Sequence, residues 1–296
     1  MELTDTDLPS VFRDADRAAK QAQRGTLRWT LVRLTGAVAA AIGGAISLAL
    51  FGKEWAGAIS ALGFGAALVA EFVLLQSGYE RSWYQSRASA ESLKTIAWRY
   101  AVAADPFPAS LPPAKTDQLL ANRIRDVLRA TGTAGGVNAS ADLLPPQLIK
   151  VRRSSFEERR HVYLRDRLQN QLAWYSRESD RNRRRSAYFR AGLVMGEVVA
   201  VVFSVLRFSG VIKVDLAGIF AAMVAAAASW LAVRQFESLA TAYALAGQEL
   251  TTLQVLIGAT EEPRWSQVVA DAEEAISREH TTWQASRRVV PHQRSA

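Results

Sequence analysis

The sequence of 296 residues contains no cysteine. The chain therefore has no disulfide and no thiolate metal site, and it fits a reducing compartment. Its three histidines, His161, His280 and His292, are scattered, which argues against a histidine metal cluster. We recognise no secretory signal, because no small-residue cleavage pattern follows the first long apolar run, which starts near residue 34.

Sequence motifs of enzymes are also missing. The chain has no GxGxxG, Walker loop, HExxH or GxSxG pattern, and its acidic residues and histidines do not cluster by type. We therefore expect a protein that is not an enzyme and that has no catalytic residue, no metal and no cofactor.

The net charge is +8, and it comes from one part of the chain. Residues 150–190 hold thirteen Lys/Arg against five Asp/Glu, a net of +8, so the rest sums to zero. This basic block ends directly before the apolar run AGLVMGEVVAVVFSVL. Such a cluster is typical of a segment that sets membrane topology and contacts anionic lipid. We therefore expect no nucleic-acid partner, and we interpret Arg183, Arg184, Arg185 and Arg190 as lipid-contacting, with polyphosphate binding as a minor alternative.

Four apolar segments occur in two pairs, at about residues 34–52, 55–76, 189–208 and 215–233. A helix needs roughly 20 residues to cross about 30 Å of hydrocarbon. Polar turns at Lys53–Glu54 and around Arg207–Asp215 make each pair a helical hairpin. The predicted fold is an all-α membrane protein with two tandem transmembrane hairpins, that is, four spans. A soluble domain with two buried hairpins is the alternative.

The distribution of Lys and Arg predicts the orientation. The turns carry Lys53, Arg207 and Lys213, whereas the other ends of the hairpins carry several arginines each. Positive charge stays on the cytoplasmic side. Both turns should therefore face outward, and the N-terminus, the middle of the chain and the C-terminus should be cytoplasmic, at the bacterial inner membrane.

Each hairpin continues into a helix-compatible segment, to Asp105 in the first and about Thr260 in the second, and each segment ends at a proline. A helix over residues 55–104 would be roughly 75 Å long, of which the bilayer takes about 30 Å. We expect each span to run unbroken through single Gly78 or Gly247 into a cytoplasmic helical bundle. Strands are expected nowhere.

Small residues recur at every fourth place, as in Gly36, Ala40, Gly44 and in Gly57, Ala61, Gly65. Such stripes let helices approach closely in lipid. They predict tight hairpins and helix contacts between subunits of a homo-oligomer, with packing inside the hairpin alone as the alternative.

The same organisation appears twice, which indicates two related units. We expect a first two-span unit at 1–135, a linker at 136–147, a second two-span unit at 148–288 and a tail at 289–296. The linker is the best boundary because it reads as a glycine- and proline-containing loop.

Two stretches resemble the SLATT superfamily, the SMODS- and SLOG-associating two-transmembrane effector domains of bacteria. They are WYQSRASAESLKTIAWRY at 83–100 and YLRDRLQNQLAWYSRESDRN at 163–182, and SREHTTWQ near the C-terminus resembles the closing helix of the family. The resemblance implies a membrane effector of a bacterial conflict or defence system, of a kind proposed to form pores when a nucleotide signal or infection trigger is sensed. This chain differs by carrying two units and no visible sensor domain.

Two carboxylates lie inside the predicted spans. Glu71 is near the cytoplasmic end of its span. In a hairpin that turns at residues 53–54, it lies opposite Gly36, which is one helical turn from Arg33. An Arg33–Glu71 pair is therefore the simplest interpretation. Glu197 faces an alanine-rich partner span and has no obvious cation there. An intramembrane acid is a functional candidate. Glu197 would either pair with Arg190 or Arg234, line a pore that favours cations, or stay protonated or reach to the interface.

The cytoplasmic helices supply a second set of candidates. Arg87, Glu91 and Lys94 lie at i, i+4 and i+7 and form a charge ladder. A solvated face or ion pairs between helices is the simpler interpretation, and a site for a phosphorylated ligand is the other. Candidates for gating or ligand contact are Arg87, Glu91, Lys94, Trp98, Arg99, Trp174 and Tyr175.

Three functions remain open at this stage. The first is an oligomeric channel or pore-forming effector in the bilayer, gated through its cytoplasmic helices by a nucleotide or protein trigger. The second is a membrane-anchored helical scaffold that recruits a cytoplasmic partner without conducting ions. The third is a small transporter, which is disfavoured because the two hairpins share one orientation and lack broken helices.

Overall fold

The computed structural model describes residues 2–46, 49–50, 53–133 and 142–287. The chain forms two compact units that are not continuous in sequence. We call them the hairpin unit, made of residues 23–79 and 178–242, and the bundle unit, made of residues 1–22, 80–177 and 243–296. Residues 136–141 of the predicted linker and the whole predicted tail, 289–296, lie outside the described residues.

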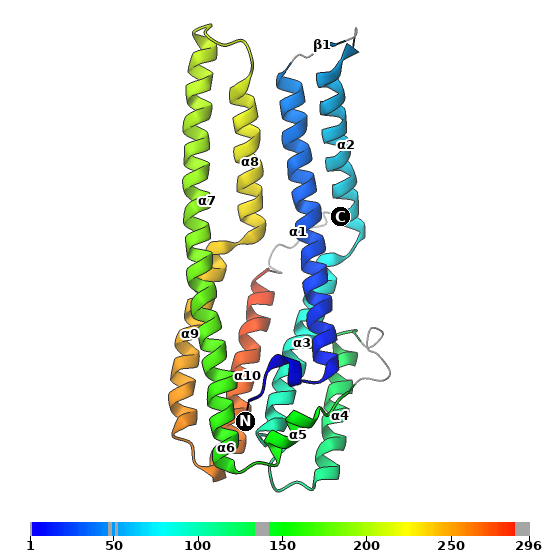
Figure 1. Cartoon of the computed structure of the whole chain (residues 1–296), viewed down its shortest axis with the longest axis vertical. Coiled ribbons are helices and arrows are strands. Elements are labelled where there is room, and N and C mark those ends of the chain that lie inside the picture. Colours follow the sequence, from blue (N-terminus) through cyan, green and yellow to red (C-terminus); the bar gives the residue numbers. More distant parts are fainter. Residues whose placement is uncertain (1, 47–48, 51–52, 134–141, 288–296) are drawn as a thin grey trace, which may run out of the picture. The chain divides into compact units, whose positions relative to one another are not determined.

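The hairpin unit contains two helical hairpins (Figure 1). The first consists of α1 (Ser10–Ala45), the short strands β1 (Ala49–Leu50) and β2 (Lys53–Glu54), and α2 (Trp55–Gln76). The second consists of α7 (Asn170–Phe208) and α8 (Leu216–Arg234). Both α1 and α7 begin in the bundle unit. Asp215 caps α8 by accepting a hydrogen bond from the amide of Gly218, at 3.1 Å.

Among the described residues, three helices are long and apolar enough to cross a bilayer, namely α2, the helical run Phe156–Phe208 that contains α7, and the run Leu216–Gly258 that contains α8. In their most apolar windows, 11%, 0% and 0% of the residues are buried inside the protein, so these surfaces suit lipid or another subunit. The first predicted span is different. Its helix α1 ends at Ala45, and residues 47–48 and 51–52 of that span lie outside the described residues.

The expectation of no strands is wrong in one small place. Ala49 pairs with Glu54 and Leu50 pairs with Lys53 in an antiparallel ladder at the turn of the first hairpin. Two residues per strand do not change the all-α class. No alternating pattern of the kind that predicts a strand is possible in so short a ladder.

Small residues hold the first hairpin together, but only partly as predicted. A Cβ placed on Gly36 would lie 2.7 Å from the carbonyl oxygen of Gly63, and one on Gly63 would lie 2.6 Å from the amide nitrogen of Ala40. The contact face of α2 is therefore the one with Gly63. Gly57 and Gly65 are exposed, and an added Cβ at either meets no atom within 4 Å.

The prediction that the second and fourth spans continue unbroken into the cytoplasmic helices is also wrong. α2 ends at Gln76 and α3 (Tyr79–Ala101) starts after Gly78, whose φ is +59°. α8 ends at Arg234 and α9 (Phe236–Gly258) starts after Gln235, whose φ is +48°. A left-handed residue interrupts a right-handed helix, so both hairpins have a joint at the same place in their sequence.

The bundle unit contains the remaining elements, which are η1 (Asp5–Asp7), α3, α4 (Pro113–Ala130), α5 (Pro146–Arg152), α6 (Phe156–Val162), the π-helix η3 (Tyr163–Gln169), most of α9, and α10 (Glu262–Arg287). Its core is rich in aromatic side chains, and Trp98, Tyr100, Tyr163 and Tyr175 are at most 2% exposed.

Candidate functional site

The two intramembrane carboxylates have different surroundings. Glu71 on α2 accepts a hydrogen bond from Arg33 on α1, with 2.7 Å between Nη1 and Oε2. Both side chains are partly exposed, at 43% and 35%. The charge of Glu71 is therefore compensated inside its own hairpin.

Glu197 has no hydrogen bond or ion pair to any other described residue. It is exposed on α7, in one stripe with Val194, Val201 and Val205, which are 59–62% exposed. The neighbouring Gly196 faces the other way, because a Cβ there would meet Val224 of α8 at 2.7 Å. The carboxylate therefore lies on the surface that the second hairpin leaves uncovered.

The two partners considered for Glu197 are engaged elsewhere. Arg190 pairs with Glu237 in the first turn of α9. The guanidinium of Arg234 lies over the ring of Phe236, with its Cζ 5.1 Å from the ring centroid. Of the three alternatives for Glu197, pairing with either arginine is therefore not found among the described residues.

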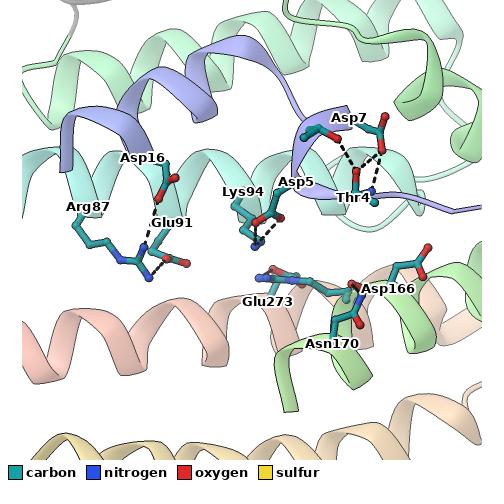
Figure 2. Close-up of polar contacts among 12 residues, drawn as sticks. Thr4, Asp5, Asp7, Asp16, Arg87, Glu91, Lys94, Asp166, Asn170 and Glu273 are labelled. Carbon is teal, nitrogen blue, oxygen red and sulfur yellow. Dashed lines mark hydrogen bonds and ion pairs between the residues drawn. The ribbon is translucent and has the colours of Figure 1, made fainter. Parts of the chain in front are cut away.

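The charge ladder of α3 forms a polar seam with the N-terminal segment (Figure 2). Arg87 pairs with Glu91 and approaches Asp16 at 3.8 Å, and Lys94 pairs with Asp5 at 2.7 Å. These contacts correspond to the simpler interpretation of the ladder, namely ion pairs between helices. Its two cations already face carboxylates.

Trp98 and Arg99, which follow the charge ladder on α3, make packing and hydrogen-bond contacts inside the bundle unit. Trp98 is 2% exposed and packs edge-on against Tyr163, with centroids 6.0 Å apart. Arg99 donates a hydrogen bond to the carbonyl oxygen of Ala270 on α10, at 2.5 Å. The indole Nε1 of Trp98 is buried and has no partner among the described atoms.

Trp174 and Tyr175, the aromatic pair of α7, form a cluster with Tyr243 of α9. Their ring centroids lie 5.0 Å and 5.9 Å from that of Tyr243. A Cβ at Gly247 would meet Tyr175 at 3.9 Å, so the glycine allows the two helices to approach. This cluster joins α7, which leads into the second hairpin, to α9, which follows that hairpin.

Sequence reasoning missed a buried ion pair. Arg167 of η3 donates two hydrogen bonds to Glu273 of α10, each 2.8 Å long, and the two side chains are 2% and 0% exposed. Tyr163 donates a third bond to Glu273, at 2.9 Å. π-Helical turns often occur at functional sites. Glu273 stands in DAEEA, which reads as a solvated helix face, and its partner lies 106 residues earlier.

The basic cluster lies within α7, and all four of its arginines are exposed. No ion pair is seen for Arg183 and Arg184 among the described residues. Arg185 lies over the ring of Phe236, with its Cζ 5.9 Å from the centroid. Arg190, at the start of the apolar run, is paired with Glu237. The predicted lipid contacts therefore include residues with quite different surroundings.

No group of three or more histidine and acidic side chains that could hold a metal occurs in the part of the chain that the structure describes. Residues 9–160 match the family model for the SMODS and SLOG-associating 2TM effector domain 3, and residues 163–283 match that for domain 1. No curated protein and no solved structure matches the chain. The two models together cover nearly the whole length, and their two-transmembrane description agrees with the long apolar helices. The chain thus belongs to the SLATT family of membrane effector domains associated with SMODS and SLOG conflict systems, and it carries two such domains in tandem.

Proposed function

We propose that the chain is a homo-oligomeric channel or pore-forming effector of the bacterial inner membrane, acting in a conflict or defence system. The observation that carries this proposal is Glu197, an exposed carboxylate without a partner in the described chain, inside an apolar helix. At 1.5 Å per residue it lies about 10 Å from Arg190 and about 15 Å from Arg207, near the middle of the span.

An unpaired carboxylate in hydrocarbon is costly. A charge at the centre of a membrane helix costs about 2.5–3.5 kcal/mol on insertion scales. Water in a pore removes that cost, because the carboxylate stays hydrated. Several copies of α7 around an axis would form a ring of Glu197, which attracts cations. One chain has too few spans to enclose a pore, so the proposal requires several copies.

The proposed topology has four spans, with α1 and α2 in the first hairpin and α7 and α8 in the second. The apolar part of α1 from Leu34 to Ala45 covers only about 18 Å. Both turns face outward and both termini are cytoplasmic, since arginines gather at the other ends of the hairpins. The two repeats would divide near residues 136–147.

The polar seam of Arg87, Glu91 and Lys94 is the proposed gating contact. It joins α3 to the segment that contains Asp5 and Asp16. The side chains of Arg87, Glu91 and Lys94 are partly exposed, at 32%, 13% and 17%, and ion pairs near the surface contribute only about 0–1 kcal/mol each. A trigger, whether a nucleotide or a protein, could therefore replace them at little cost.

Ion flux through liposomes that contain the purified chain tests the proposal. We expect Glu197→Gln to lower the preference for cations over anions, because the ring loses its charge. Glu71→Gln is the matched control, since it removes the same charge from the other hairpin, where Arg33 already compensates it.

Two outcomes would contradict the proposal. One is unchanged flux and ion selectivity in Glu197→Gln. The other is an ordered oligomer that conducts nothing under nucleotide or infection-derived triggers and has no axial path. The second result would favour a membrane-anchored scaffold that recruits a cytoplasmic partner.

A further inference from the structure

The end of the second hairpin opposite its turn carries an open cleft. The apolar side chains of Leu193, Leu231 and Phe236 line it, together with Arg190. Arg190 directly precedes the apolar run of α7, and Arg234 directly follows that of α8. The cleft therefore lies where this hairpin leaves the hydrocarbon, with an apolar wall and one lining arginine, Arg190.

Phe236 stands at the centre of the basic residues. Its side chain is 3% exposed, and the Cζ atoms of Arg234 and Arg185 lie 5.1 Å and 5.9 Å from its ring centroid. Neither guanidinium has an ion pair with a carboxylate within the described residues. The acidic residue of the cleft, Glu237, pairs with Arg190. Three arginines against one glutamate leave a local charge of +2.

Two guanidiniums on the same ring repel one another at a membrane boundary, where the dielectric is low. An anion that accepts hydrogen bonds from both removes that repulsion. Arginine forms parallel hydrogen bonds to phosphate oxygens, which makes a phosphate group the best match. The first turn of α9 also lines the cleft, and the positive end of its helix dipole adds to the attraction.

We propose that this cleft binds the headgroup phosphate of an anionic phospholipid. Arg185 and Arg234 do not line the cleft, but both contact Phe236, which does, so they hold the phosphate oxygens at its rim. The wall with Leu193 and Leu231 follows the first part of an acyl chain. Arg183 and Arg184 contribute only a diffuse positive field. The inference rests on the membrane placement of α7 and α8 and does not depend on whether the protein conducts ions.

The test compares lipid binding to the full chain in neutral detergent by native mass spectrometry. Phosphatidylglycerol competes with phosphatidylcholine of the same chain length. We expect Arg185→Gln/Arg234→Gln to weaken phosphatidylglycerol binding about tenfold, which corresponds to about 1.4 kcal/mol. The matched control is Arg183→Gln/Arg184→Gln, which also removes two positive charges, both from α7 beside Arg185, and should change binding by less than about twofold.

Equal losses in both double variants would overturn the proposal, because they would indicate a diffuse basic surface. So would inorganic phosphate or ATP displacing the lipid at the concentration of the lipid itself, because the cleft would then take a free phosphate. If the glutamine pair fails to fold, Arg185→Lys/Arg234→Lys keeps the charge but not the planar guanidinium fork. It should still lower the preference for phosphatidylglycerol by about threefold, and an unchanged preference would refute the assignment.

A separate comparison keeps this inference distinct from the channel proposal. Glu197→Gln should leave phosphatidylglycerol binding unchanged, because Glu197 is about 10 Å along α7 from Arg190. Failure of the flux experiment would thus leave the lipid site standing. Loss of lipid preference in the arginine variants with normal flux would support the site without bearing on conduction.

Discussion

Replacing Glu273 with alanine tests the buried ion pair of the bundle unit most directly. The substitution leaves the guanidinium of Arg167, which is 2% exposed, without the two hydrogen bonds that compensate its charge. It also removes the acceptor of the Tyr163 hydroxyl. Breaking a buried pair by deleting one partner costs about 3–5 kcal/mol. We therefore expect a loss of that size in the stability of the contact between η3 and α10.

Amide hydrogen exchange of peptides from α10, in the full chain in detergent, measures this loss. Since every 1.4 kcal/mol is a factor of ten, protection should fall by about two to nearly four orders of magnitude. Glu157→Ala is the control, because its pair with Arg160 is exposed and contributes at most about 0.5 kcal/mol.

The triple variant Tyr163→Phe/Arg167→Met/Glu273→Leu separates charge from packing. It replaces every polar member of the cluster with an apolar side chain, so no buried charge or hydroxyl is left unpaired. Such replacements are often neutral or stabilising. We expect protection to return close to that of the original chain. The reasoning is refuted if Glu273→Ala costs less than about 1 kcal/mol, or if the triple variant is no more stable than the single one.

Three further predictions follow from the backbone and from one buried tyrosine. Burial and a hydrogen bond to Asp117 raise the pKa of Tyr100. The stability that the neutral tyrosine contributes is therefore complete below the ordinary tyrosine pKa of about 10 and is lost as the pH rises from there through the raised pKa. Tyr100→Phe should flatten the alkaline decline in melting temperature. Gly63→Val should separate α1 from α2 and lower the melting temperature strongly, whereas Gly65→Val on the open face should not, as thermal unfolding in detergent would check. Gln235→Gly should stabilise the joint between α8 and α9 by about 1 kcal/mol, measured by hydrogen exchange, because the left-handed conformation penalises a side chain.

The spans could be read from the sequence because they depend on a local property. The second predicted span, 55–76, coincides with α2, and the fourth, 215–233, agrees with α8 within one residue. Apolar runs of this length leave few alternatives in any environment. The first span agrees less well, because α1 ends at Ala45, before the predicted end of the span at residue 52.

The joints and the buried ion pair could not be read in this way. A single glycine such as Gly78 is tolerated inside many helices, and glutamine has no preference for positive φ, so neither position signals a break. The pair of Arg167 and Glu273 depends on a contact between distant helices. The sequence also predicted the wrong contact face of α2, namely the face with Gly57 and Gly65 in place of the face with Gly63. Glycines occur on both faces of this helix, and only the packing of α1 decides which face is in contact.

The two hairpins treat their intramembrane carboxylates in opposite ways, and this difference bears on how a duplicated chain would work. The first hairpin pairs Glu71 with Arg33 and closes its helices over Gly36 and Gly63. The second leaves Glu197 exposed. If both repeats lined a pore equally, the first would be expected to keep an uncompensated polar group as well. The contrast therefore favours an assembly in which the second hairpin faces the axis and the first surrounds it, in contact with lipid.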